Sequence, residues 1–134
     1  MTAPALEAVR LSLHVLAATI WVGGQFTLAG LVPTLRSLGP DAPRTVARAF
    51  SRLLWPAFGV LVLTGIWNIQ ADHTSGQGHV WNAVLGAKIA VVLLSGVAAA
   101  VHQRARSPKA LAVSGGISGL AALGALVLGV VLAG

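Results

Sequence analysis

The chain has 134 residues, of which 56% are hydrophobic and only 9% charged, with a formal net charge of +6. Because a water-soluble globular domain carries about 25% charged residues, this composition excludes that class, and it is also far too apolar for a disordered chain. The mean hydropathy of +0.84 is that of an integral membrane protein. The chain has no cysteine, which excludes disulfides and thiolate metal sites.

Four apolar runs follow one another along the chain, and each is near or above the ~20 residues that cross a bilayer as a helix. They are residues 8–32, 53–71, 80–101 and 111–133. They predict an all-α fold, an integral membrane four-helix bundle in which residues 1–134 form a single domain. The first run is too long for a signal peptide, so we interpret it as a retained span that contacts the lipid bilayer like the other three.

The basic residues indicate how these spans are oriented. They lie in two clusters between apolar runs, Arg36, Arg44, Arg48 and Arg52 in the first and Arg104, Arg106 and Lys109 in the second. Residues 71–79, between the second and third runs, contain no Lys or Arg. The positive-inside rule therefore predicts an N-out/C-out topology, and no nucleic-acid partner is expected. We also expect the first helix to end near Pro33 and a short basic helix to precede the second span.

The first run carries polar and aromatic side chains on one stripe. His14, Trp21 and Leu28 are seven residues apart, with Gln25 on the same side and Ala17 and Ala18 between. Polar side chains inside a membrane are costly and face the protein interior. A stripe that combines an imidazole, an indole and small residues suggests a face that lines a flat ligand or a close neighbour.

The third run has a similar stripe of Lys88, Ser95 and His102. At 1.5 Å per residue, His14 and Lys88 are both expected roughly 10 Å inside the outer end of their helices. His102 is roughly 21 Å further in, too far to share a metal with His14. A lysine at that depth needs a partner, either Asp72 or an anionic or metal-containing ligand.

The remaining polar groups lie at the outer end. Asp72, His73 and His79 form an alternative site, for the entry of copper from outside, or are ordinary solvated loop residues. The fourth run has small residues at four-residue spacing, Ser114 with Ser118 and Gly115 with Gly119. This spacing allows close helix packing, within the bundle, in a homo-oligomer or in a larger membrane complex.

Three segments together resemble a known family: "LHVLAATIWVGG", "FSRLLWPAFGVLVLTGIWNI" and "LGAKIAVVLL". They resemble the CopD family of bacterial copper-resistance proteins and are similar to the HemJ-type membrane proteins of protoporphyrinogen oxidation. The resemblance implies the bacterial cytoplasmic (inner) membrane, and heme b held by a histidine and a lysine that match His14 and Lys88. Trp21, Gly23 and Gly24 match a stretch that both groups share. HemJ-type proteins continue with an aromatic-rich segment, where this chain has "QFTLAGLVPT".

The residue inventory favours heme b over copper. Copper(I) prefers cysteine and methionine ligands, whereas the only methionine here is Met1. Heme b needs one axial imidazole, an apolar slot and partners for two propionates. The expected cofactor residues are His14 on iron, Trp21 against the ring, and Gly23 and Gly24 beside it. Arg10 is expected at a propionate, and Lys88 at a propionate or, when deprotonated, in the sixth position on iron. A protoporphyrinogen oxidase, a redox protein, a copper transporter and a non-catalytic accessory subunit all stay open as functions.

Overall fold

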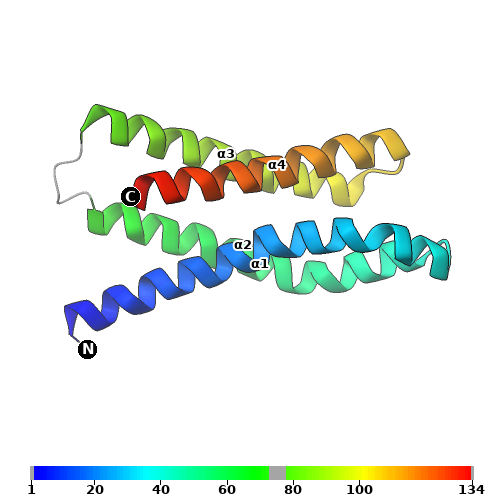
Figure 1. Cartoon of the computed structure of the whole chain (residues 1–134), viewed down its shortest axis with the longest axis horizontal. Coiled ribbons are helices and arrows are strands. Elements are labelled where there is room, and N and C mark those ends of the chain that lie inside the picture. The colour runs from blue at the N-terminus through cyan, green and yellow to red at the C-terminus, as the bar shows by residue number, and fades with distance from the viewer. Residues whose placement is uncertain (1, 73–77, 134) are drawn as a thin grey trace. The chain divides into compact units, whose positions relative to one another are not determined.

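The computed structural model describes residues 2–72 and 78–133, and these residues form four helices and no strand. The helices are α1 (Ala3–Leu38), α2 (Ala42–Asp72), α3 (His79–Arg104) and α4 (Pro108–Ala133) (Figure 1). Each is long and apolar enough to cross a membrane. The predicted all-α fold with four membrane-spanning helices is therefore confirmed, and the protein is a multi-pass membrane protein.

The helices pair into two compact units. The first, Met1–Ser75, contains α1 and α2, and the second, Gly76–Gly134, contains α3 and α4. Within each unit the two helices run antiparallel as a hairpin (Figure 1). The four apolar runs of the sequence lie inside these four helices. A single domain that includes both hairpins, and the N-out/C-out topology, stay predictions.

The first helix continues past the proline at which we expected it to end. α1 runs through Pro33 to Leu38, and α2 begins at Ala42, so the basic helix expected to lead into the second span forms the first turns of α2 and is continuous with that span. Pro33 removes one backbone donor, which membrane helices tolerate when the surrounding hydrogen bonds persist. The chain turns at Gly39, whose φ of 149° is rarely open to other residues.

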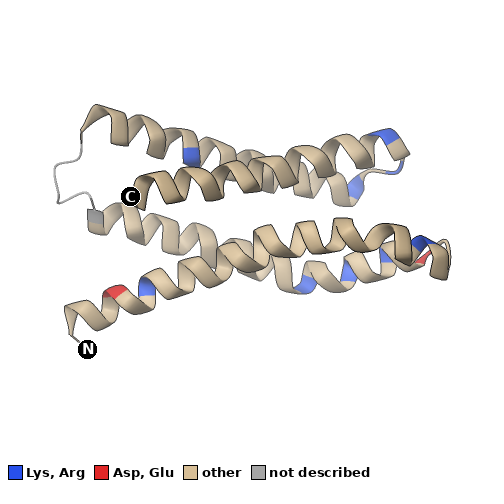
Figure 2. Ribbon diagram, in the orientation of Figure 1, with Lys and Arg blue, Asp and Glu red and all other residues tan. Residues whose placement is uncertain are grey.

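Basic residues gather near the turn of each hairpin (Figure 2). Four arginines flank the α1–α2 turn, and Arg104, Arg106 and Lys109 flank the α3–α4 turn. The other two basic residues, Arg10 and Lys88, lie well inside helices and away from these clusters. Their separation from the basic turns makes them the two cations whose positions need a specific explanation.

In the second hairpin, hydrogen bonds of polar side chains join α3 to α4. The hydroxyl of Ser95 donates to the carbonyl of Ser118 and the hydroxyl of Ser118 donates to the carbonyl of Ser95, each at 2.9 Å. Both serines are almost fully buried, 1% and 2% exposed.

His102 also joins α3 to α4. Its Nδ1 lies 2.9 Å from the carbonyl of Leu111, which can only accept, so Nδ1 carries the proton. The ring rests on Gly115, where an added methyl group would lie 3.0 Å from His102 Cε1.

We expect Ser95→Ala and Ser118→Ala each to destabilise the second hairpin by about 0.5–2 kcal/mol, because a buried carbonyl partner is lost and hydrogen bonds between membrane helices are of that size. The free energy of unfolding, measured on the full chain by denaturant titration in detergent, checks this. Ser37→Ala is the matched control, since Ser37 is exposed and bonds only within its own helix. Equal stability of all three variants and the wild type would contradict the role of the serine pair.

Candidate functional site

The histidine of the first helix is bound by the second. His14 Nδ1 lies 2.8 Å from the hydroxyl oxygen of Thr64, fifty residues away in α2. Thr64 is buried, and His14 is half-buried between the two helices. Gly65 lies beside the ring, and an added methyl group there would be 3.6 Å from His14 Cε1. The imidazole is thus held by a hydrogen bond on one edge and by a small residue at Cε1.

The hydrogen bonds of Thr64 decide which nitrogen of His14 carries the proton. The Thr64 hydroxyl lies 2.7 Å from the carbonyl of Val60 and 3.2 Å from that of Leu61, and it donates its single proton within α2 to these acceptors. The oxygen can then only accept from His14, so His14 Nδ1 is the protonated nitrogen. In the neutral imidazole, Nε2 then has the lone pair that a metal ion requires. Histidine ligands of metals commonly donate the other ring N–H in this way, which fixes the tautomer and the ring orientation.

Trp21, expected to lie against a cofactor ring, belongs to an aromatic cluster within the first unit. Its side chain is 2% exposed. The ring centroid of Trp21 is 4.5 Å from that of Phe58 and 5.4 Å from that of Trp55, both in α2. Such tilted contacts are favourable for aromatic pairs. In this structure Trp21 joins α1 to α2, and its contact with a cofactor stays a prediction.

The two adjacent glycines of the first helix differ in their surroundings. A methyl group added at Gly24 would lie 2.6 Å from Leu54 Cδ2, so this position brings α1 close to α2. Gly23 is exposed and has no atom within 4 Å of an added methyl group. Of the two, Gly23 has the open surroundings, but it lies nine residues after His14 and therefore on the opposite side of α1.

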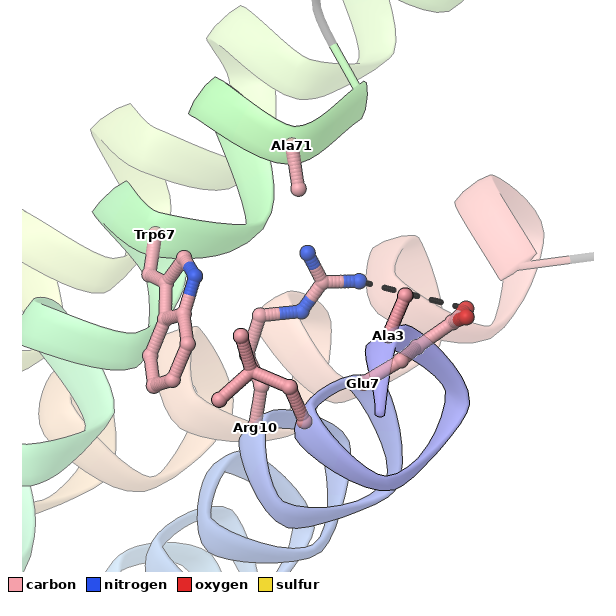
Figure 3. Close-up of a pocket in the computed structure, with 6 residues that line it drawn as sticks. Ala3, Glu7, Arg10, Trp67 and Ala71 are labelled. Carbon is pink, nitrogen blue, oxygen red and sulfur yellow. Dashed lines mark ion pairs between the residues drawn. The ribbon is translucent and has the colours of Figure 1, made fainter. Parts of the chain in front are cut away.

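Arg10 is a buried cation one helical turn before His14. Its side chain is 9% exposed, and among the described side chains it pairs with Glu7, at 4.0 Å between Nη2 and Oε1. Arg10 and Glu7 line a pocket of about 350 Å³ together with Ala3, Leu6, Trp67 and Ala71. In Figure 3 the guanidinium extends into the space between α1 and the end of α2, beside Trp67 and facing Ala71. His14 is not among the lining residues, so the pocket is separate from the imidazole.

Lys88 lies on the face of α3 that packs against α4. A methyl group added at Gly129 would be 3.1 Å from Lys88 Nζ and 3.5 Å from Cε, so the lysine side chain crosses α4 where it has no side chain. Among the described residues Lys88 makes no ion pair. His14 and Lys88 belong to different units, and the prediction that they face each other stays untested.

The alternative copper entry site falls largely outside the described side chains. His73 lies outside the described residues, and so does the side chain of Asp72, whose backbone ends α2. His79 begins α3 and is exposed. Within residues 2–72 and 78–133, no three His, Asp or Glu side chains lie close enough together to hold a metal ion.

The chain matches no protein-family model, no curated protein and no solved structure. The resemblance to CopD and HemJ-type proteins stays a prediction, and the function is argued from the side chains of the two hairpins. Sequence reasoning missed two parts of the site, the bond from His14 to Thr64 and the cluster of Trp55 and Phe58 around Trp21. Thr64 is an isolated hydroxyl in an apolar run, which is the one signal that indicated a polar contact there.

Proposed function

We propose that this protein binds heme b in the bacterial cytoplasmic membrane, with both termini outside, and acts in electron transfer or porphyrin chemistry. His14 Nε2 is the iron ligand of this proposal. One observation supports it above the others: the Thr64 hydroxyl accepts the Nδ1 proton of His14, so the imidazole is in the tautomer of a metal ligand.

The residues around His14 fit the chemical needs of heme b. Helices α1 and α2 supply an apolar environment in which a single imidazole suffices as an axial ligand. Arg10, one helical turn before His14 on α1, is a buried cation suited to a propionate, and Lys88 of the second hairpin would be a second, half-buried cation. When bound, heme would supply one-electron chemistry or an oxidant for a porphyrin. The chain itself would hold the iron ligand, fix its tautomer and keep water away.

A partner protein that packs on α4 would use the part of its surface that α3 leaves open. Ser114 and Ser118, which have the predicted small-residue spacing, already face α3. Gly116 and Gly119 of α4, in contrast, have no atom within 4 Å of an added methyl group. We propose that a homo-oligomer or a larger complex would pack on these glycines.

An absorption spectrum of the detergent-purified protein, expressed with ample heme, tests the proposed function. We expect a Soret band, α and β bands on reduction, and about one iron per chain by metal analysis of the same sample. A colourless protein without iron would overturn the proposal. Copper in place of iron would favour the CopD-like alternative, and absence of both metals would favour an accessory subunit.

A further inference from the structure

The pocket between the start of α1 and the end of α2 holds an incompletely satisfied charge. Arginine stays protonated in proteins and offers five N–H donors, yet no described residue accepts a hydrogen bond from Arg10. Its Nε is buried without a partner. The 4.0 Å separation from Glu7 is an ion pair but exceeds hydrogen-bond length. An arginine side chain that is nine-tenths buried, with so few contacts among the described residues, favours an oxyanion as ligand.

The position of the pocket along the helices indicates where that oxyanion comes from. Arg10 is two turns into α1, and Trp67 and Ala71 belong to the last two turns of α2. These are the helix ends opposite the α1–α2 turn, where the apolar runs of the sequence meet the membrane surface. Tryptophan is typical of this level, which is also the level of lipid phosphates. Ala3, Leu6 and Ala71 add an apolar lining that suits an acyl chain more than a free ion.

Glu7 adds a second charge at the mouth of the same pocket. Its carboxylate is 62% exposed, whereas Arg10 lies deeper. A ligand that carries a phosphate and, a few bonds away, an ammonium group would complement both side chains. We propose that this pocket binds the phosphatidylethanolamine headgroup, with the phosphate on Arg10 and the ammonium group on Glu7 (Figure 3).

The binding of named lipids to the full-length, delipidated protein tests the assignment. Native mass spectrometry in detergent would compare phosphatidylethanolamine, phosphatidylcholine and inorganic phosphate. We expect phosphatidylethanolamine to bind most tightly, because the trimethylated ammonium of phosphatidylcholine has no N–H for Glu7. Arg10→Gln should weaken phosphatidylethanolamine binding by about tenfold or more, since a charge-assisted hydrogen bond is lost. Glu7→Gln should remove the preference over phosphatidylcholine, and Arg36→Gln, an exposed arginine near the α1–α2 turn, should change neither.

Two results with the wild type would overturn the proposal: equal binding of both lipids, or binding of inorganic phosphate without lipid. Two results with Arg10→Gln would also overturn it: unchanged binding of phosphatidylethanolamine, or loss of heme with lipid binding intact. The last would assign Arg10 to a propionate. The comparison of the two lipids on the wild type needs no variant, so it tests the predicted lipid preference even if Arg10→Gln does not fold. The lipid-binding measurement can be made on protein without heme. Failure of the lipid proposal can therefore be distinguished from failure of the heme proposal.

Discussion

Replacing His14 by alanine is expected to remove the bound heme from the purified protein while most of the fold remains. The substitution deletes the only proposed protein ligand to iron, and it also deletes the hydrogen bond to Thr64. A lost hydrogen bond of this kind costs about 1 kcal/mol of stability, which a four-helix membrane protein withstands. The measurement is the Soret absorbance per chain and the iron content, compared with wild type at equal protein concentration.

His79→Ala is the matched control, since His79 is exposed at the start of α3 and should keep wild-type heme content. Thr64→Val refines the test, because valine has nearly the same shape but accepts no hydrogen bond. Loss of such an outer partner typically weakens metal binding about 10–100-fold, so we expect partial heme content in this variant. Full heme in His14→Ala would refute the assignment of the ligand. Full heme in Thr64→Val would refute the role of Thr64 in setting the tautomer.

The second large effect is expected at Trp21, the centre of the aromatic cluster of the first hairpin. Trp21→Ala should lower the free energy of unfolding by about 3–5 kcal/mol, because it leaves a cavity and removes contacts with Trp55 and Phe58. Unfolding of the full chain by a denaturing detergent, followed by circular dichroism, measures this change.

Two further variants serve as controls for the Trp21→Ala measurement. Trp21→Phe retains an aromatic ring and should lose much less stability than Trp21→Ala. Trp81→Ala removes an indole that is half-buried and belongs to the other hairpin, and it should cost clearly less. A Trp21→Ala variant no less stable than Trp81→Ala would show that the cluster does not stabilise the first hairpin. If Trp21→Ala loses heme while Trp21→Phe keeps it, a ring at this position also contributes to cofactor binding.

The proposed iron ligand and the proposed lipid site use different residues of the first hairpin, and a heme propionate would compete with the lipid phosphate for Arg10. His14 and Thr64 form the ligand pair, and Arg10 and Glu7 lie one to two helical turns closer to the start of α1. Binding of the lipid headgroup would fix the start of α1 and the end of α2 together. The pair of His14 and Thr64, which spans the same two helices, would be positioned more precisely as a result.

The sequence alone determined that the protein has four membrane-spanning helices, because apolar length and a near absence of charge leave a chain no other stable arrangement in lipid. It also singled out His14, Lys88 and Arg10, since a polar side chain inside an apolar run is costly and therefore visible in the sequence. The sequence predicted the exact ends of the helices less well. Proline is tolerated within a membrane helix, so Pro33 did not end α1, and the turn formed at Gly39 instead.

Only the tertiary structure decided which side chains meet. The apolar runs fix each helix but not the register between antiparallel neighbours, which depends on how side chains of both helices interlock. That register brings Thr64 to His14, packs Trp21 against Trp55 and Phe58, and places Lys88 across Gly129. The sequence indicates which residues share one face of a helix, but it does not indicate which face of another helix they contact. The tautomer of His14, the aromatic cluster and the anion pocket each depend on such a contact between two helices.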